Sequence, residues 1–385
     1  PLGTFFQKLA QYSHSQGNTT FKINFNGGDS YYAWANQIDN FSDKPECWAE
    51  YLSLYLKKNK IDLIIVYGDC RYYHAEAAKV AKKLAIDYWV CEEGYLRAGF
   101  VTVEQNGCNA NSTLDNSKLA IEQTTDAPTI SNEQVGNTFF QRTIFASRYY
   151  WEINKNKSKF AHYHHHRPWV WWQEGLFWLN NFKQKFISGI VDPLTLSRFI
   201  KKYNKKTFLL PLQLEVDFQM RRHSKFDSVK ESIRYTVESF AAHANKNDAL
   251  LIKHHPQSRG FSHYGKYIKT LTQQLNISDR VLYIHQAQLP WLYPQCKGVV
   301  TVNSTVGLSA ILHYLPTITL GKAIYNIPEL TFQGKLDNFW QSNFAVNEDL
   351  FVKFQSYLQQ KTQLAGDFYL PSITFLATFH QKLMA

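Results

Sequence analysis

Two polar motifs in the second half of the sequence follow apolar runs of the kind that form buried strands. Lys253-His254-His255-Pro256 comes directly after Ala249–Ile252, and because proline cannot continue a strand's hydrogen-bond ladder, we expect the strand to end there. Asn303-Ser304-Thr305 follows Gly298–Val302 and precedes a predicted helix over Val306–His313. Small hydroxyl residues at such a turn cap the helix, whose first backbone N–H groups can bind an anion. Together the motifs predict a phosphate site; the alternative is two ordinary strand ends with capping residues.

Four carboxylates have the right chemistry for a nucleophile, an acid or a base. Glu92, Glu93 and Asp69 belong to the first half of the chain, and Asp217 belongs to the second. A carboxylate paired with an acid–base group is what sugar transfer through an oxocarbenium-like state requires. For Asp217, the alternative is an aspartate that only stabilises a loop or caps a helix. Three further side chains could orient a hydroxyl or clamp an anionic group: Gln213, Gln219 and Arg97.

The first-half residues are carried by strands that alternate with helices. Strands are predicted over Phe21–Phe25, Ile61–Tyr67 and Ile86–Cys91. This alternation predicts a parallel, doubly wound sheet, which binds ligands at the carboxyl ends of its strands. A glycine-containing polar turn follows each strand, and the alternative for any one of them is a plain turn: Asn26–Asp29, Gly68–Arg71 and Glu92–Arg97.

The second half repeats the pattern. Further strands are predicted over Lys206–Leu212, Arg280–Ile284 and Thr317–Leu320. The prediction is an α/β protein with two Rossmann-like, doubly wound parallel-sheet domains facing a central cleft, the GT-B arrangement of many nucleotide-sugar transferases. We expect an N-terminal domain, an aromatic and basic helical connector, a C-terminal domain, and C-terminal helices that return to the first domain: residues 1–145, 146–205, 206–345 and 346–385.

The composition narrows the partner and the compartment. The chain has 385 residues, enough for two domains, and a formal net charge of +11, which indicates an anionic partner such as a nucleotide, a nucleic acid or a membrane surface. Five cysteines without regular spacing favour a reducing compartment. No signal-peptide pattern and no apolar run of about eighteen residues is present, so we expect no membrane-spanning segment. Neither a GxGxxG nor a Walker A motif occurs, which argues against a dinucleotide-dependent dehydrogenase and a P-loop NTPase.

The connector is rich in aromatic and basic residues. Tryptophans alternate with apolar and basic residues between about 145 and 200, a composition typical of an interfacial membrane anchor. The alternative is a set of helices that pack their aromatics between domains. A histidine cluster over His162–His166 lacks a cysteine or carboxylate at ligand spacing, so we predict no metal. The predicted membrane-contact residues are Trp169, Trp171, Trp172, Phe177 and Trp178.

The motifs together resemble those of the bacterial capsule-polysaccharide β-Kdo transferases of the KpsS/LipB type. The resemblance runs from Gly3 to about Phe344, and two departures from the family pattern are Ala98, where proline is usual, and the pair Glu215-Val216. It is carried by six segments: Asn24–Asp29, Gly68–Arg71, Glu92–Arg97, Lys253–Pro256, Val302–Gly307 and Leu330–Gly334.

The resemblance implies a retaining enzyme that transfers Kdo from CMP-β-Kdo to (lyso)phosphatidylglycerol and so initiates the poly-Kdo linker of a capsule. It implies Asp217 as the nucleophile, with Glu93 as the second catalytic residue. The donor side is assigned to Lys253, His255, Pro256, Asn303, Ser304, Thr305, Gln213 and Gln219. The sugar and acceptor side is assigned to Arg97, Gly94, Asp69, Arg71, Asp29 and Gln333.

The resemblance also implies a place of work and partners. We expect no cofactor, no metal and no nucleic acid, and a peripheral position at the cytoplasmic face of the inner membrane. The expected partners are CMP-Kdo, the phospholipid acceptor, the membrane surface, a KpsC-type transferase and the capsule export complex. Two alternatives stay open: an enzyme that extends an existing Kdo linker, and a non-catalytic anion-binding scaffold of the capsule machinery.

Overall fold

The computed structural model describes residues 2–96, 99–125, 138–164, 171–215, 218–260 and 262–385, and of residues 139, 171–178, 218, 219 and 221 it describes the backbone. The chain divides into two compact units. Unit 1 comprises Pro1–Leu114, Asp126–Trp171 and Ser356–Ala385, and unit 2 comprises Asp115–Thr125 and Trp172–Gln355. The domain ranges expected from the sequence stay a prediction.

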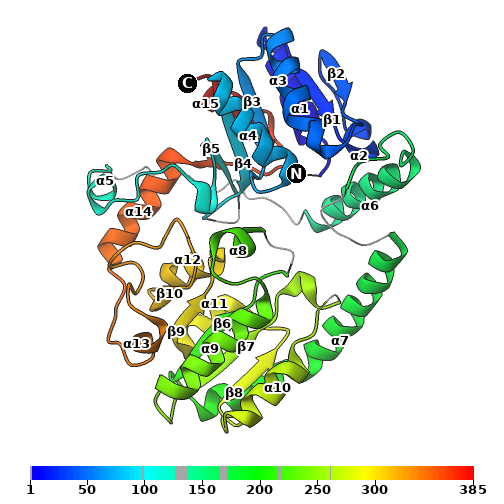
Figure 1. Ribbon diagram of the computed structural model, residues 1–385. Coiled ribbons are helices and arrows are strands. Elements are labelled where there is room, and N and C mark those ends of the chain that lie inside the picture. The colour runs from blue at the N-terminus through cyan, green and yellow to red at the C-terminus, as the bar shows by residue number, and fades with distance from the viewer. Residues whose placement is uncertain (1, 97–98, 126–137, 165–170, 216–217, 261) are drawn as a thin grey trace. The chain divides into compact units, whose positions relative to one another are not determined.

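Unit 2 is built on a five-stranded sheet in which every pairing is parallel. The strands stand in the order β10-β9-β6-β7-β8, so consecutive strands along the chain are joined by crossovers through helices (Figure 1). This confirms the predicted α/β class. The strands are β6 (Thr207–Pro211), β7 (Ala249–Lys253), β8 (Val281–Ile284), β9 (Cys296–Thr301) and β10 (Thr317–Thr319).

The core of unit 2 lies on both faces of this sheet. Leu250 and Ile252 point into one apolar cluster, whereas Leu251 between them belongs to the other, because successive side chains of a strand alternate between faces. A sheet buried on both faces explains why its strands are continuous apolar runs. The helices of unit 2 are α5 (Lys118–Glu122), α7 (Trp171–Lys202), α8 (Phe218–His223), α9 (Val229–His243), α10 (Gly265–Gln274), α11 (Leu289–Leu292), α12 (Thr305–Leu312) and α13 (Leu336–Phe339), with 3-10 turns η3 (Pro256–Ser258) and η4 (Tyr293–Gln295).

Unit 1 contains a mixed sheet of order β11-β5-β4-β3, together with a separate parallel pair, β1 and β2. Only β3 and β4 are parallel within the larger sheet, since β5 returns antiparallel to β4 and β11 pairs antiparallel with β5. The sequence patterns did not predict β2, β5 or β11. The strands are β1 (Phe21–Asn24), β2 (Gln37–Asn40), β3 (Leu63–Tyr67), β4 (Asp87–Glu93), β5 (Phe100–Gln105) and β11 (Gln363–Ala365).

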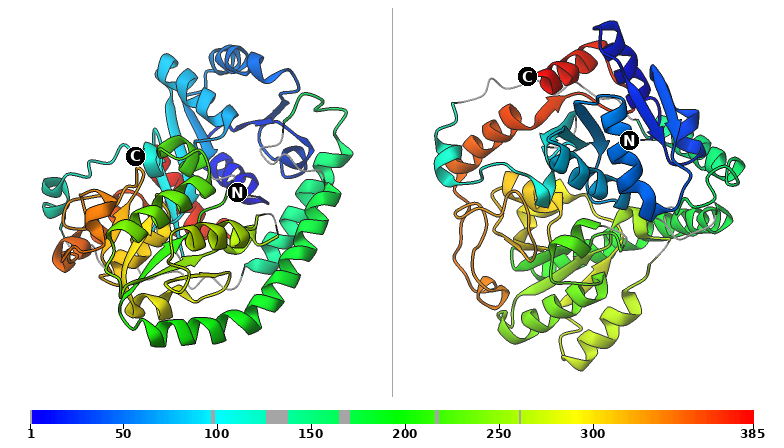
Figure 2. Two further views of the ribbon diagram at one scale, coloured as in Figure 1. Left: turned by 60° about the horizontal axis from the view of Figure 1, so that its bottom comes forward. Right: turned by 45° about the horizontal axis from the view of Figure 1, so that its top comes forward.

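Both ends of the described chain pack on one face of the unit 1 sheet. Phe5 near the start of α1 touches Phe375 and Phe379 of α15, and the two helices lie side by side in Figure 2. The other face is covered by α3 and α4. The helices of unit 1 are α1 (Phe5–Ser15), α2 (Gly27–Tyr31), α3 (Trp48–Lys58), α4 (Tyr72–Leu84), α6 (Phe139–Lys155) and α15 (Ile373–Met384), with 3-10 turns η1 (Pro45–Cys47) and η2 (Asn109–Asn111). Helix α14 (Glu348–Lys361) crosses the boundary between the units at Gln355. None of the described helices is both long enough and apolar enough to cross a membrane.

Candidate functional site

Lys253 is the last residue of β7 and a charged side chain that is almost buried. It is only 6% exposed, and burial, with a further contribution from Arg259, lowers its pKa to about 8. Within the described part of the chain, no hydrogen bond or ion pair satisfies its ammonium group. Burying a cation without a partner is costly, so a position of this kind is suited to an anionic ligand that supplies the missing charge.

The two histidines after Lys253 have different surroundings. His254 is buried, with the Tyr283 hydroxyl 2.7 Å from Nδ1 and the Ser258 hydroxyl 3.1 Å from Nε2. Burial and the neighbouring His285 lower the pKa of His254 to about 3, so its ring is neutral. His255 instead caps η3: its Nδ1 accepts from the backbone N–H of Gln257, which places the ring proton on Nε2. His254 therefore holds the turn together, and His255 is the ligand candidate.

A side-chain bridge joins the carboxyl ends of β6 and β9. Gln213 donates from Nε2 to Oδ1 of Asn303 at 2.9 Å, and the backbone N–H of Asn303 donates to Oε1 of Gln213 at 3.3 Å. Because Gln213 is buried, these reciprocal bonds satisfy its amide and fix the entry into α12. Both residues were assigned to the donor side from the sequence.

The first turn of α12 offers backbone N–H groups at the same edge. Ser304 is the N-cap and accepts through Oγ from the N–H of Val306. The Tyr325 hydroxyl donates to the carbonyl oxygen of Ser304, and Gly307 allows the helix to approach the Tyr325 ring. Thr305 follows the cap as the first helical residue. A helix start held in this way is suited to bind a phosphate group.

The strand order explains why these residues share one edge. β9, β6, β7 and β8 are consecutive neighbours in a parallel sheet, so the residues after each strand lie on the same side. Sequence reasoning did not assign Arg259, a buried side chain whose guanidinium donates to the carbonyl oxygen of His285 at 3.0 and 3.3 Å. No periodicity marks Arg259 in the sequence, whereas His285, directly after β8, had the signal of a strand-end polar residue. The combined arrangement is chemically suited to an anion.

Asp29 and Asp69, two of the site residues predicted in unit 1, are held by hydrogen bonds within that unit. Asp29 accepts through Oδ2 from the N–H of Phe25 and the amide of Asn26, at 3.1 and 3.0 Å. Its Oδ1 accepts from the Tyr149 hydroxyl at 2.9 Å. Tyr163 has its pKa raised mainly by burial and next by Asp29, while Arg71 opposes that shift. Asp29 and Arg71, which follow different strands, are thus both close to Tyr163.

Asp69 is buried beneath the loop that follows β5. Its Oδ2 accepts from the N–H of Cys108 and the amide of Asn111, at 3.1 and 3.0 Å, and its Oδ1 accepts from the thiol of Cys70. Glu92 accepts from the amide of Asn109 in the same loop. The backbone before Asp69 favours glycine, because Gly68 has a φ of +69°, in the left-handed region. The predicted role of Asp69 toward a sugar or acceptor stays a prediction.

Glu93 ends β4 in more open surroundings. Its Oε1 lies 3.4 Å from the Tyr67 hydroxyl and 3.7 Å from a guanidinium nitrogen of Arg142. Gly94 follows, and any side chain there would collide with the backbone of Phe100 on the paired strand β5. Glycine is therefore needed for packing at this position, whatever its role toward substrate.

Several predicted site residues are not covered by the described coordinates. Asp217, Arg97 and Trp169 lie outside the described residues, and their assigned roles stay predictions. The same holds for the side chains of Gln219, Trp171, Trp172, Phe177 and Trp178. Gln333 is described and belongs to unit 2, where its amide donates to the carbonyl oxygen and hydroxyl of Thr331 at 2.9 and 2.8 Å.

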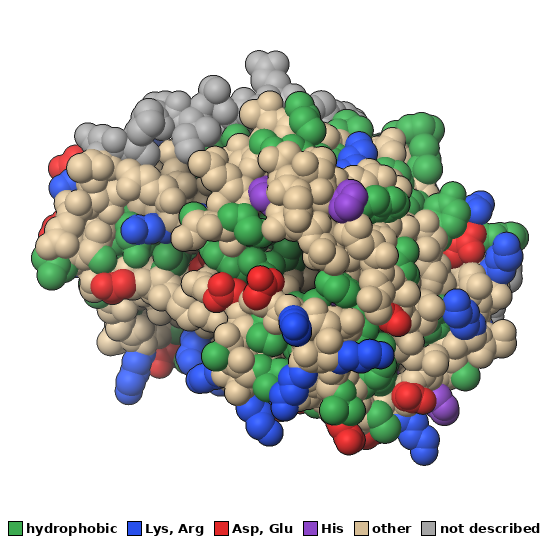
Figure 3. All heavy atoms as spheres, turned by 90° about the horizontal axis from the view of Figure 1, so that it is seen from above, with side chains coloured by type: hydrophobic (Ala, Val, Ile, Leu, Met, Phe, Trp, Pro, Cys, Tyr) green, Lys and Arg blue, Asp and Glu red, His purple; other side chains and the backbone are tan. Residues whose placement is uncertain are grey.

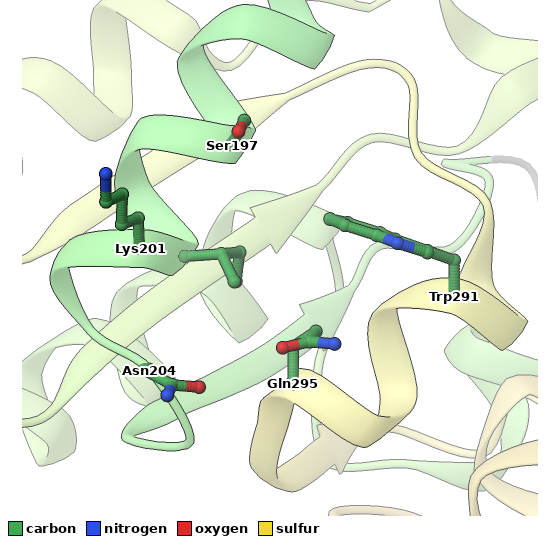
Figure 4. Close-up of a pocket in the computed structure, with 6 residues that line it drawn as sticks. Ser197, Lys201, Asn204, Trp291 and Gln295 are labelled. Atoms are coloured by element: carbon green, nitrogen blue, oxygen red, sulfur yellow. The ribbon is translucent and has the colours of Figure 1, made fainter.

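A small cavity of about 220 Å³ lies elsewhere in unit 2. Figure 4 shows Lys201 and Asn204 on one side of it, and Trp291 and Gln295 on the other. Asn204 precedes β6 and Gln295 precedes β9, so the cavity lies where the strands begin. The carboxyl ends of the strands, which carry Lys253 and which we call the Lys253 edge, are on the opposite side of the sheet. We therefore separate it from the candidate anion site.

The described residues include no metal-binding cluster, and the face drawn in Figure 3 shows no broad basic patch. Across the described ranges, no group of three or more His, Cys, Asp or Glu could hold a metal ion. On the face drawn in Figure 3, the described Lys and Arg side chains are scattered, with Asp and Glu between them. The argument for an anion site is therefore based on Lys253, which is only 6% exposed.

The sequence and the fold were compared with those of known proteins. The sequence model of the family described as capsule polysaccharide biosynthesis protein matches residues 62–369. The chain is 35% identical to the capsule polysaccharide export protein KpsS of Escherichia coli, over 96% of this chain and 95% of that protein. It is 34% identical to the capsule polysaccharide modification protein LipB of Neisseria meningitidis serogroup B, over 96% and 90% of the two chains. Among solved structures, KpsC of Thermosulfurimonas dismutans, a β-Kdo 2,7 transferase, is similar at 14% identity with a TM-score of 0.47, covering 90% of this chain and 92% of that one.

Proposed function

Because the chain belongs to the capsule polysaccharide biosynthesis protein family, we propose that it is a retaining β-Kdo glycosyltransferase. It takes Kdo from CMP-β-Kdo and transfers it to (lyso)phosphatidylglycerol, which initiates the poly-Kdo linker of a capsular polysaccharide. The observation that carries the proposal is Lys253, a lysine that is only 6% exposed, at the edge where the N-terminus of α12 also lies. The motif resemblance to the KpsS/LipB-type transferases supplies the identity of the donor.

The chemistry of CMP-Kdo matches this edge. Its single phosphate belongs to the leaving group, CMP, and its Kdo carries a carboxylate, so the donor presents two anionic groups. Lys253 and the N–H groups at the start of α12 would bind the phosphate, and His255 would donate from Nε2. As the bond from the sugar to the phosphate breaks, negative charge grows on CMP, and donors fixed in place stabilise it without rearranging.

Asp217 is the proposed nucleophile of a double displacement. A carboxylate oxygen of Asp217 bonds to the anomeric carbon of Kdo while CMP leaves with the electron pair of the broken bond. An acceptor hydroxyl then attacks the same carbon, gives its proton to a base, and releases the Asp217 carboxylate. Two inversions retain the configuration. Glu93, with Arg97, is the candidate on the sugar and acceptor side.

A phospholipid acceptor gives the enzyme its place of work. We assign the chain to the cytoplasmic face of the inner membrane as a peripheral protein, next to a KpsC-type transferase and the capsule export complex. The relatives named as export and modification proteins of capsule polysaccharide support this context. The remaining acceptor-side residues, Asp29, Asp69, Arg71, Gly94 and Gln333, keep their predicted roles.

The proposal is tested by intact-protein mass spectrometry after incubation with CMP-Kdo. Wild type and Asp217→Ala are compared, each with and without lysophosphatidylglycerol. We expect a Kdo-sized mass gain on wild type alone, which the lipid discharges to a Kdo–lipid product. A protein that neither binds nor turns over CMP-Kdo contradicts the transferase proposal and favours a scaffold. Turnover only with an acceptor that already carries Kdo assigns the chain to linker extension.

A further inference from the structure

Helix α7 exposes apolar side chains along one side. Leu179, Phe182, Phe186, Ile190 and Leu194 are between 58% and 73% exposed. They are spaced by three or four residues, so they lie on one face of the helix, which we call the outward face of α7. A run of large apolar side chains in water is unfavourable, and exposed apolar patches commonly mark interaction surfaces.

The opposite side of α7 is polar and buried. Asn181, Ser188 and Asp192 are only 4% to 8% exposed. Oδ2 of Asp192 accepts from the backbone N–H groups of His285 and Gln286, at 2.8 and 2.7 Å, directly after β8. A rotation of the helix that buried the outward face would leave these N–H groups and the carboxylate without partners. Hydrogen bonds to the sheet edge therefore fix the apolar side chains on the outside.

The charged residues of α7 favour an anionic partner for the outward face. Lys183 is exposed on the outward face, between Leu179 and Phe186, and Lys185 is exposed next to the polar side of the helix. Over the described side chains of α7, from Leu179 to Lys202, the single carboxylate is Asp192, and it is buried. The outward face thus combines apolar side chains with the cation of Lys183, has a second exposed lysine beside it, and exposes no described carboxylate. An apolar stripe with flanking lysines is complementary to a membrane surface that contains acidic lipids.

We propose that the outward face of α7 binds the surface of an anionic lipid bilayer, with the helix axis parallel to the membrane plane. The stripe from Leu179 to Leu194 is about 22 Å long at 1.5 Å per residue, and Figure 2 shows α7 running along the outer side of unit 2. The inference rests on the proposed function in one respect, because a phospholipid acceptor requires a membrane-bound enzyme. It differs from the predicted tryptophan anchor, since it depends on residues C-terminal to Trp178.

The test is co-sedimentation of the full chain with vesicles, in the absence of CMP-Kdo. Vesicles of phosphatidylcholine are compared with vesicles that contain phosphatidylglycerol as well. The test variant is Phe186→Gln with Ile190→Gln. The matched control is Leu54→Gln with Ile373→Gln, which replaces apolar residues of similar exposure, 64% and 68%, on α3 and α15. Equal melting temperatures of the two variants establish that both fold.

We expect at least a tenfold loss of affinity for the anionic vesicles in the α7 variant, less than a twofold change in the control, and weaker binding of wild type at high salt. Unchanged binding of the α7 variant overturns the proposal, as does a wild type that binds neither vesicle. Unchanged vesicle binding with loss of a wild-type dimer in sedimentation velocity assigns the face to self-association, which also overturns it. Kdo transfer to lysophosphatidylglycerol in detergent micelles is measured separately, so failure of the proposed enzymatic function is distinguished from failure of this surface.

Discussion

The polar residues at the ends of the strands are used differently in the two units. In unit 2, Lys253 is almost buried and carries a pKa lowered to about 8 by burial, with no described partner for its ammonium group. In unit 1, Asp29 and Asp69 accept hydrogen bonds from hydroxyl, amide and thiol groups of the same unit. The edge in unit 2 keeps a charge for which the described residues offer no partner, whereas Asp29 and Asp69 in unit 1 have hydrogen-bond partners within their own unit.

This difference distinguishes a residue suited to bind a ligand, Lys253, from residues that stabilise the loops around a site, Asp29 and Asp69. An uncompensated buried cation lowers stability in the absence of ligand and gains most when an anion binds. Carboxylates that already accept several hydrogen bonds stabilise their loops and gain little from a new partner. We therefore expect substitutions at the unit 2 edge to affect donor binding, and substitutions in the unit 1 network to affect stability.

The largest expected effect is on transfer by Lys253→Met. Loss of a fixed cation at the leaving phosphate should reduce kcat/KM for CMP-Kdo by on the order of 10²- to 10³-fold. In wild type, kcat/KM should fall as pH rises through about 8, because Lys253 loses its proton there. The variant should lack this alkaline limb. Lys230→Met, which removes an exposed lysine of α9, is the control, and an equal loss in both variants would contradict the assignment.

The same variant should be more stable than wild type. The pKa of Lys253 is lowered from 10.5 to about 8 in the folded state, so the unfolded chain binds the proton more tightly. The charged Lys253 therefore lowers the free energy of unfolding of wild type by its full amount below pH 8, and this destabilisation disappears as pH rises toward 10.5. Replacing the ammonium group by an apolar side chain should raise the free energy of unfolding at pH 7 by about 1–3 kcal/mol. Urea unfolding at pH 7 and 10 measures this, and a destabilised Lys253→Met would argue that Lys253 has a compensating anion.

Glu104 offers a pH test inside the unit 1 network. Burial raises its pKa to about 7, although the hydroxyls of Ser112 and Tyr95 donate to it and partly offset the shift. Because the folded state binds the proton more tightly, the stabilisation is complete below pH 4.5 and is lost as pH rises through about 7. The free energy of unfolding of wild type should fall by about 2 kcal/mol between pH 5 and pH 8.5 relative to that of Glu104→Gln, which has no proton to lose. Parallel unfolding curves for the two proteins at both pH values would refute this.

The smallest effect is expected for Tyr149→Phe. The lost hydroxyl donates to Asp29 and accepts from Asn26 at 3.0 Å, so its removal should lower the free energy of unfolding by about 1–2 kcal/mol. Donor affinity should not change. Tyr31→Phe, at a half-exposed tyrosine of α2, provides a control without a comparable network. A strong loss of donor affinity in Tyr149→Phe would show that the hydrogen bonds among Asn26, Asp29 and Tyr149 contribute to donor binding, which contradicts the difference proposed between the two units.

Most of the unit 2 fold could be predicted from the sequence, because each strand is a short apolar run followed by a helical pattern. The start of α12 and the end of β7 were placed correctly within one residue, since proline and hydroxyl residues mark them. β11 could not be predicted, because three residues pair with β5 from a distant part of the chain and carry no local signal. The sequence did not predict which side of α7 is exposed. That side is determined by Asp192, which is buried by hydrogen bonds to the residues after β8, and only the tertiary structure brings those residues near α7.

In the site, residue types could be predicted but their roles could not. The sequence gives no means to tell His254, locked between Tyr283 and Ser258, from His255 beside it. Nor does it reveal that Asp69 is covered by the loop after β5. Both distinctions depend on burial and on hydrogen-bond partners that are remote in the sequence.

The central claim is that the Lys253 edge of unit 2 binds the phosphate of the donor, and calorimetric titration with CMP tests it most directly. CMP lacks the Kdo group and requires no acceptor, so the measurement reports only the binding of the phosphate and the nucleoside. We predict that wild type and Lys230→Met bind CMP equally well and that Lys253→Met binds at least tenfold more weakly, while its melting temperature is unchanged or higher. Equal CMP affinity in all three proteins would contradict the account, because the buried cation would then have no part in donor binding.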